Sequence, residues 1–213
     1  MMANTNLTAW YDDVLPSVPG CPQTMALDAI RKAAIEFCER SWAWIYNPAA
    51  ANVVADQIAY AFVPPSNAVV SKVLYVFHDG VPIYPRSTDQ LDAMYQEWRA
   101  TSGTPQYYTQ EDERNLLLVP VPAAALTGGL KMRVSLKPKF DATDIESRMY
   151  EEYREAIVAG ALSRLMMIPK KPYTDLATAS VNKAIFDDMI ATVRHKVQKG
   201  YARAPLRNAA HFF

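Results

Sequence analysis

The spacing of apolar residues changes twice along this chain, and this change limits the folds that it can adopt. From Pro22 one side of the predicted segment repeats every three or four residues, as in a helix: Leu27, Ile30, Ala34, Phe37, Ser41 and Trp42. Between residues 51 and 140 the repeat shortens to two residues, as in a strand. After Asp144 the helical spacing returns. The pattern predicts an α+β fold with a helix, a β-rich middle and two long helices.

The first predicted helix begins at Pro22, where proline loses no hydrogen bond because the first-turn N–H is unbonded in any helix. It is predicted to end near Trp44 or Tyr46. Residues 1–20 are interpreted as an irregular N-terminal arm, since its end carries Pro16, Pro19 and Gly20.

The two cysteines, Cys21 and Cys38, are separated by helix on this reading. At ~1.5 Å per residue they would lie about 25 Å apart, beyond the ~7 Å that a disulfide allows between Cα atoms. We therefore expect two reduced thiols that pack as small apolar side chains, which suits folding in the cytoplasm.

The middle of the chain is predicted to hold short strands and one helix. Asp79-Gly80 indicates a type I′ hairpin between strands Val69–Phe77 and Val81–Tyr84. Ser87 and Gln90 form a capping box for a helix through about Ala100, stopped by Gly103. Further strands are expected at Ile58–Phe62, Tyr107–Tyr108 and Leu116–Val119, the last two joined as a hairpin by residues 110–115.

Leu130–Lys137 has the clearest strand pattern, with Leu130, Met132, Val134 and Leu136 on one face and Lys131, Arg133, Ser135 and Lys137 on the other. Gly128-Gly129 is interpreted as the hairpin before it. Lys131, Arg133, Lys137 and Lys139 are candidates for a polar face that meets a neighbouring molecule or a channel, or that is simply solvated.

The C-terminal half predicts helices over Glu146–Ile168 and Thr174–Lys199, joined by a short Lys-Lys-Pro link and therefore antiparallel. Gly160 costs the first of them about 1 kcal/mol relative to alanine, which indicates that another backbone approaches closely there. The expected organisation is a helical bundle (21–50 and 141–200) that carries a β-rich insertion with one helix (51–140).

Composition excludes several classes of function. Lysine and arginine total 22 and acids also total 22, so the chain lacks the basic excess of a dedicated nucleic-acid binder. No apolar run approaches the ~20 residues of a membrane helix, and no basic segment leads into an apolar one, so neither secretion nor membrane insertion is expected. We find no metal-ligand spacing, nucleophile motif or phosphate loop, and predict no catalytic residue, metal or cofactor.

The last segment, YARAPLRNAAHFF, cannot continue a helix through Pro205, yet it is rich in apolar and aromatic residues. Either it folds back on its own domain, or it is an extended arm (201–213) that docks on another protein. The anchors of such an arm would be Tyr201, Arg203, Leu206, Arg207, Phe212 and Phe213.

Several stretches in order along the chain resemble the head-to-tail adaptor (connector) proteins of tailed bacteriophages, which form the ring between portal and tail. They are Val18-Pro19-Gly20-Cys21-Pro22, the Ala-rich 33–41, Leu118-Val119-Pro120-Val121-Pro122, Val134-Ser135-Leu136-Lys137-Pro138, and 153–162 with Pro169 and Lys171-Pro172. Each is degenerate alone, and the specificity lies in their succession over most of the chain.

The resemblance implies a non-enzymatic structural protein in the virion neck, assembled in the host cytoplasm. It implies a ring of usually twelve copies that binds the portal through the C-terminal arm and receives a tail tube or nozzle on the other side. Double-stranded DNA would pass through the ring during ejection without sequence-specific binding. Short-tailed and long-tailed particles both fit. Another tail-completion or baseplate component, or a small soluble enzyme with a site built from scattered residues, are the alternatives.

Overall fold

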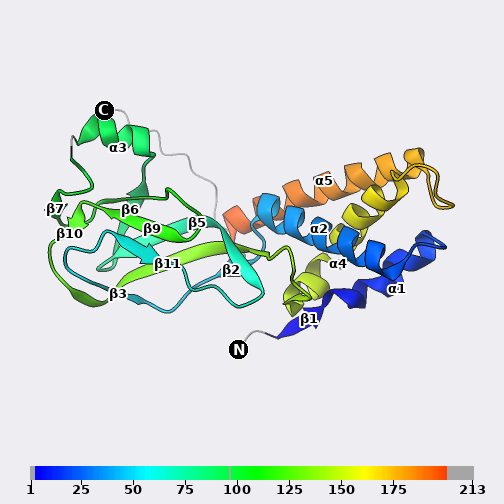
Figure 1. Cartoon of the computed structure of the whole chain (residues 1–213), viewed down its shortest axis with the longest axis horizontal. Coiled ribbons are helices and arrows are strands. Elements are labelled where there is room, and N and C mark those ends of the chain that lie inside the picture. The colour runs from blue at the N-terminus through cyan, green and yellow to red at the C-terminus, as the bar shows by residue number, and fades with distance from the viewer. Residues whose placement is uncertain (1–2, 96, 201–213) are drawn as a thin grey trace. The chain divides into compact units, whose positions relative to one another are not determined.

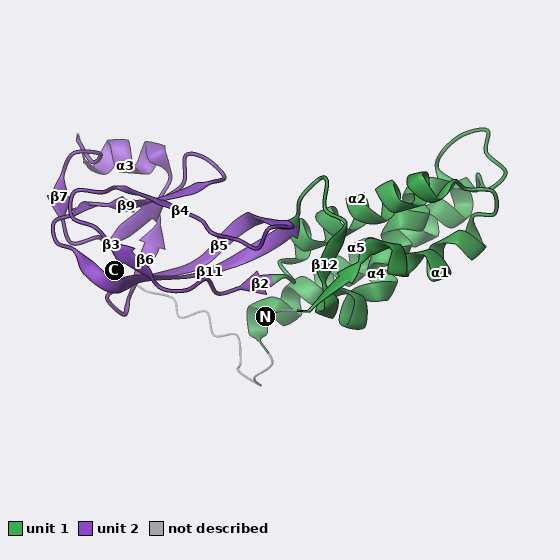
Figure 2. Cartoon of the chain, turned by 60° about the horizontal axis from the view of Figure 1, so that its bottom comes forward, with its two compact units in different colours: residues 1–44, 138–213 green, residues 45–137 purple. Residues whose placement is uncertain are grey.

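A computed structural model describes residues 3–95 and 97–200, which form a mixed α+β structure (Figure 1). The α+β class predicted from the sequence is confirmed. Two compact units divide the chain: a helical unit from residues 1–44 and 138–213, and a β-rich unit from residues 45–137 (Figure 2). The β-rich unit is thus inserted into the sequence of the helical unit. Among the described residues, no helix combines the length and apolarity needed to cross a bilayer.

Helices α2 (Gln23–Ser41), α4 (Ser147–Met166) and α5 (Leu176–Lys199) make up most of the helical unit. α4 packs against both α2 and α5, and α5 returns alongside α4 in the opposite direction (Figure 1). α2 follows Pro22 as predicted. It ends at Ser41, earlier than predicted, because Trp42 adopts a left-handed conformation (φ 59°) that ends the helical backbone.

Gly160 of α4 lies where the three helices meet. A Cβ atom at this position would be 2.7 Å from Cε2 of Phe186 on α5 and 3.0 Å from Cβ of Ala33 on α2. Both neighbours are fully buried. A close approach is present as predicted, but the neighbouring atoms belong to the Phe186 ring and the Ala33 methyl group and not to another backbone. The cost of the glycine in helix propensity is offset by burial of the Phe186 ring.

The first residues are more regular than the sequence predicted. β1 (Asn4–Asn6) pairs antiparallel with β12 (Asp144–Glu146), and η1 (Leu7–Trp10), α1 (Tyr11–Val14) and η2 (Leu15–Ser17) follow. The expectation of an irregular segment over residues 1–20 is therefore wrong. Four apolar side chains, three or four residues apart, are fully buried and hold it: Leu7, Trp10, Val14 and Val18.

The β-rich unit contains a large curled sheet. Within the described residues its eight strands are ordered β2-β11-β5-β6-β8-β9-β4, with β3 also paired to β11. β5 (Ala68–His78) and β6 (Val81–Pro85) form the predicted hairpin, and both turn residues have positive φ, 52° at Asp79 and 77° at Gly80. β8 (Tyr107–Thr109) and β9 (Asn115–Val119) form the second predicted hairpin.

Three local predictions in this unit need correction. α3 (Thr88–Met94) has the predicted capping box at Ser87, but it ends before Ala100 because Tyr95 is extended. Gly103 lies in β7 (Ser102–Gly103) rather than at a helix end. Gly128-Gly129 lies inside β11 (Leu126–Pro138), where the register against β3 shifts, and not in a hairpin.

The remaining strands are short: β2 (Ile45–Tyr46), β3 (Ala51–Val53), β4 (Ala59–Ala61) and β10 (Val121–Pro122). β10 pairs in parallel with β7 in a small separate sheet. Beside it, the fully buried Leu91 of α3 packs with Trp98 and Val119, both 1% exposed. This cluster fixes α3 against the hairpin of β8 and β9.

Candidate interaction surfaces

β11 has one buried and one exposed face over its central part. Met132 and Val134 are buried, whereas Lys131 and Arg133, which alternate with them, are exposed. The alternation predicted from the sequence is confirmed up to this point. Ser135 departs from it, since its side chain is fully buried and its Oγ has no hydrogen-bond partner among the described residues.

Lys131 and Arg133 line a groove of about 590 Å³ on the β-rich unit, which we call the basic groove. Its other walls are aromatic and aliphatic side chains together with one amide: Asn47, Pro48, Ala50, Tyr75, Phe77 and Met132. Arg133 Nε donates a hydrogen bond of 3.1 Å to Asn47 Oδ1, which holds the guanidinium at the groove. Among the described residues, no carboxylate lines this groove, so an anionic occupant would meet two cations and no repulsion.

Tyr75 and Phe77 of β5 were not singled out from the sequence. Tyr75 is 57% exposed and Phe77 is 36% exposed, whereas Val76 between them is buried. The run Val73–Phe77 is wholly apolar, so its pattern does not reveal which face of the strand is buried. The two positively charged positions on β11 were found because their neighbours alternate cleanly.

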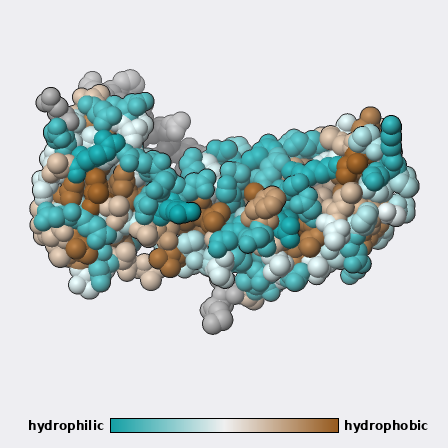
Figure 3. Space-filling view, viewed as in Figure 1, coloured by the Kyte–Doolittle hydropathy of each residue, from teal (hydrophilic) through white to brown (hydrophobic). Residues whose placement is uncertain are grey.

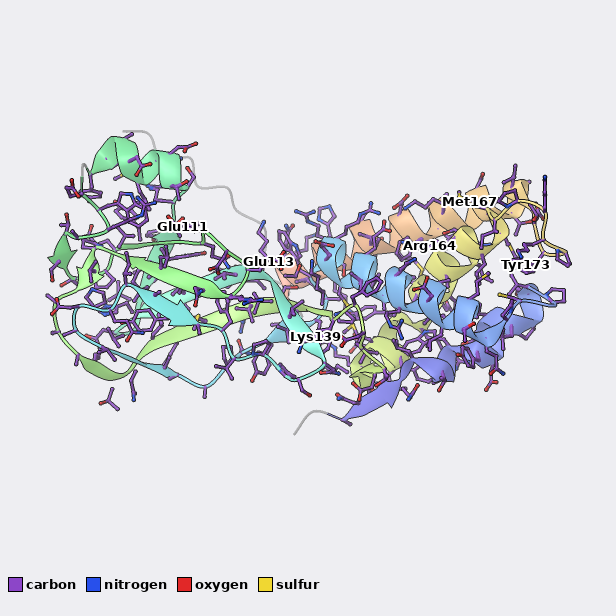
Figure 4. The ribbon with its side chains drawn as sticks, viewed as in Figure 1. Glu111, Glu113, Lys139, Arg164, Met167 and Tyr173 are labelled. Carbon is purple, nitrogen blue, oxygen red and sulfur yellow. The ribbon has the colours of Figure 1, made fainter. Side chains whose placement is uncertain are left out.

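The other two predicted cations are placed differently. Lys137 and Lys139 are both half-buried, and neither lines the basic groove. Lys137 ends the β-rich unit, and Lys139 belongs to the helical unit (Figure 4). Within the β-rich unit, the structure therefore brings Lys131 and Arg133 together at one surface and leaves Lys137 outside it.

The helical unit has a second groove, of about 520 Å³, lined by Asp13, Arg154, Glu155, Val158, Ala159, Asn182 and Ile185. Arg154 forms a two-pronged ion pair with Asp13, which ties α4 to α1. Ile185 on α5 is 46% exposed and Val181, one turn before it, is 59% exposed. Figure 3 shows apolar areas of this kind interrupting the hydrophilic surface of the molecule.

A third groove, of about 400 Å³, lies beside the β5–β6 turn and includes His78, Asp79, Tyr84 and Tyr107. His78 is the last residue of β5. Over residues 3–95 and 97–200, no three His, Cys, Asp or Glu side chains gather as a metal site would require.

The two cysteines are free thiols, Cys38 buried and Cys21 partly exposed. Burial, with a smaller contribution from the carboxylate of Glu146, raises the pKa of the Cys38 thiol far above its usual range. Cys38 is therefore a protonated packing residue, as the sequence predicted.

The six predicted docking residues Tyr201, Arg203, Leu206, Arg207, Phe212 and Phe213 lie outside the described residues. α5 ends at Lys199, and Gly200 follows with φ 66°. The role of the segment 201–213 thus stays a prediction.

These features define a class of protein: an α+β chain with a β-rich unit inserted between helices and open, partly apolar grooves on its surface. The family model of the SU10 adaptor protein matches residues 5–209, and the chain belongs to this family. It is thus a phage adaptor-like protein and a structural component of the virion. No curated protein matches the chain.

Proposed function

We propose that the protein is a head-to-tail adaptor, which forms a ring beneath the portal, extends the DNA channel and seats the tail. The observation that carries this proposal is the family match, which spans 205 of the 213 residues and includes most of the C-terminal segment. In this proposal the protein is not an enzyme. The helices form a bundle that carries the β-rich unit, in a ring of twelve copies in the virion neck, assembled in the host cytoplasm.

Several features of the chain support this role. The formal net charge is zero, so DNA sliding through a ring would not be retained by a strong excess of cations. The grooves on the two units supply different surfaces, and a ring requires that one surface of each copy meets a different surface of the next. The segment 201–213 combines apolar anchors with two arginines, a composition that suits docking in a groove of another protein.

The test compares the full chain with a variant that ends at Gly200. Binding to purified portal protein is measured by gel filtration, and the complexes are imaged by electron microscopy. We expect the full chain to form rings on the portal and the truncated chain to keep its helical circular dichroism but lose portal binding. Equal binding by both chains would refute the role given to the segment.

Point variants test whether portal binding needs the anchor side chains or only a segment of this length. Replacing Leu206, Phe212 and Phe213 by serine should weaken portal binding at least tenfold. Replacing Asn208 and His211 by alanine in the same segment should leave it unchanged. Virions that lack the protein should carry filled or leaking heads without tails, and the position of the protein within the particle distinguishes an adaptor from a baseplate component.

A further inference from the structure

Charged side chains in the β-rich unit are segregated by position. Strands β2, β3, β5 and β11 carry four cations and no carboxylate: Lys72, Lys131, Arg133 and Lys137. Residues 86–115 carry six acids against three arginines. The unit therefore has a positive region around the basic groove and a negative region around α3 and the loop between β8 and β9.

The negative region is only partly neutralised by its own residues. Arg99 pairs with Glu111 at 2.5 Å and with Asp92 at 3.7 Å. Asp112 accepts hydrogen bonds of 2.7 Å from the backbone N–H groups of Arg114 and Asn115. Glu113, which is labelled in Figure 4, is exposed. Among the described residues, no ion pair or hydrogen bond involves its carboxylate. The tip of this loop thus presents uncompensated negative charge to solvent.

The two regions are far apart along the sheet. Strands β5, β6 and β8 lie between β11 and β9 in the sheet order. At about 4.8 Å per strand, the path along the sheet from β11 to β9 is roughly 19 Å. No ion pair joins Lys131 or Arg133 to Glu111 or Glu113 within the described residues. The charges of Lys131, Arg133 and Glu113 are therefore available to a second molecule. Glu111 would share its charge between Arg99 and such a partner.

We propose that the basic groove of one copy receives the acidic β8–β9 loop, residues 110–114, of a neighbouring copy. Lys131 and Arg133 would face Glu111 and Glu113, and the exposed rings of Tyr75 and Phe77 would be covered by the loop. Apolar burial supplies affinity in such a contact, and the charges fix its register. This inference rests on the proposed ring, because the complementary surfaces lie on different strands and join copies head to tail.

The test is a charge swap in the full chain, with ring formation on portal protein measured by native mass spectrometry and electron microscopy. Lys131→Glu with Arg133→Glu should reduce ring formation at least tenfold, because four like charges then meet. Glu111→Lys with Glu113→Lys should have the same effect. The chain that carries all four substitutions should recover ring formation, since the charges are complementary again.

Matched control variants keep the charge of each substituted side chain and change only its size and shape. Lys131→Arg with Arg133→Lys, and Glu113→Asp, should assemble like the unmodified chain. Circular dichroism and thermal unfolding show whether each variant folds, so full assembly by a folded variant that carries only one of the two charge reversals counts against the contact. If the unmodified chain forms rings and either reversal leaves them intact, or the fourfold variant fails to recover, this contact is refuted while the proposed function stands. If the unmodified chain forms no ring with portal, the proposed function itself fails.

Discussion

Arg164 of α4 donates a hydrogen bond to the carboxylate of Glu36 on α2, and in doing so it joins two of the three long helices. Lys183 of α5 lies 3.3 Å from the same carboxylate, and Arg40 lies 2.7 Å from it. Arg40 also reaches Asp187 of α5 at 2.6 Å. One carboxylate thus connects segments that are more than a hundred residues apart in the sequence.

Replacing Glu36 by glutamine should lower the free energy of unfolding by about 1 kcal/mol, because the cations lose their shared partner while solvent screens part of the effect. Urea unfolding measures the change. The control is Asp28→Asn on the same helix, which removes an exposed pair with Lys32 at 2.7 Å and should cost less than about 0.5 kcal/mol. Equal losses in the two variants would contradict a special role for Glu36.

The same network predicts a dependence on pH. Burial would raise the pKa of Glu36, but the hydrogen bond from Arg40 and the charges of Arg164 and Lys183 outweigh it and hold the pKa below 4.5. The stabilisation is complete above the ordinary pKa and is lost as the pH falls through the lowered one. The difference in unfolding free energy between the unmodified chain and Glu36→Gln should therefore shrink below pH 4.5. A difference that stays constant at acid pH would refute this.

Gly160 should not tolerate a side chain. Gly160→Ala places a Cβ 2.7 Å from the ring of Phe186, and the resulting overpacking should cost about 1–3 kcal/mol despite the better helix propensity of alanine. Thermal unfolding measures the loss. Combining it with Phe186→Leu should give a double variant that is more stable than the sum of the single losses predicts. Strict additivity would show that the two residues are not in contact.

The Asp79-Gly80 turn should depend on backbone conformation alone. Gly80 has φ 77° and open space where a Cβ would stand, so Gly80→Ala should cost about 1 kcal/mol through strain without a clash. Asp79→Asn should be nearly neutral, because asparagine readily adopts positive φ. Urea unfolding distinguishes them, and a neutral Gly80→Ala would refute the argument.

The two cysteines should differ in reactivity. A disulfide reagent that releases a coloured thiolate should modify Cys21 in the native protein and reach Cys38 only after unfolding, because Cys38 is fully buried and its thiol is kept protonated. Cys21→Ser should abolish native labelling, and Cys38→Ser should leave it unchanged. Rapid labelling of Cys38 in the folded chain would contradict its burial.

Much of the fold could be predicted from local pattern. The alternation around Met132 and the positive-φ pair at Asp79 and Gly80 each have a local physical cause that the sequence displays. The glycine at 160 is visible in the sequence, but its cause is nonlocal, since it lies against Phe186 of α5 and Ala33 of α2. The N-terminal segment was misread because its prolines suggested irregular structure, although Leu7, Trp10, Val14 and Val18 have the spacing of a buried face.

The candidate surface was only half predictable. Lys131 and Arg133 stand out beside buried neighbours, whereas exposure of Tyr75 and Phe77 depends on how β5 is covered by the rest of its unit. The early end of α3 at Met94 was likewise not predictable from the local pattern, because the residues that follow it pack against a distant strand. Trp98 packs with Leu91 and Val119, and its indole N–H donates a hydrogen bond of 2.7 Å to Asp92. The spacing of apolar residues alone does not specify this arrangement.

Because residues 45–137 are inserted between α2 and α4, the order of synthesis matters for the growing polypeptide. As α2 emerges from the ribosome, the ring of Phe37 stays uncovered until α4 has been translated, because Tyr153 of α4 packs against it at 5.3 Å between ring centroids. The inserted strands can meanwhile complete their own sheet. A chaperone that shields apolar surface on nascent chains would find its target in this interval, at the amino-terminal helix rather than at the later strands.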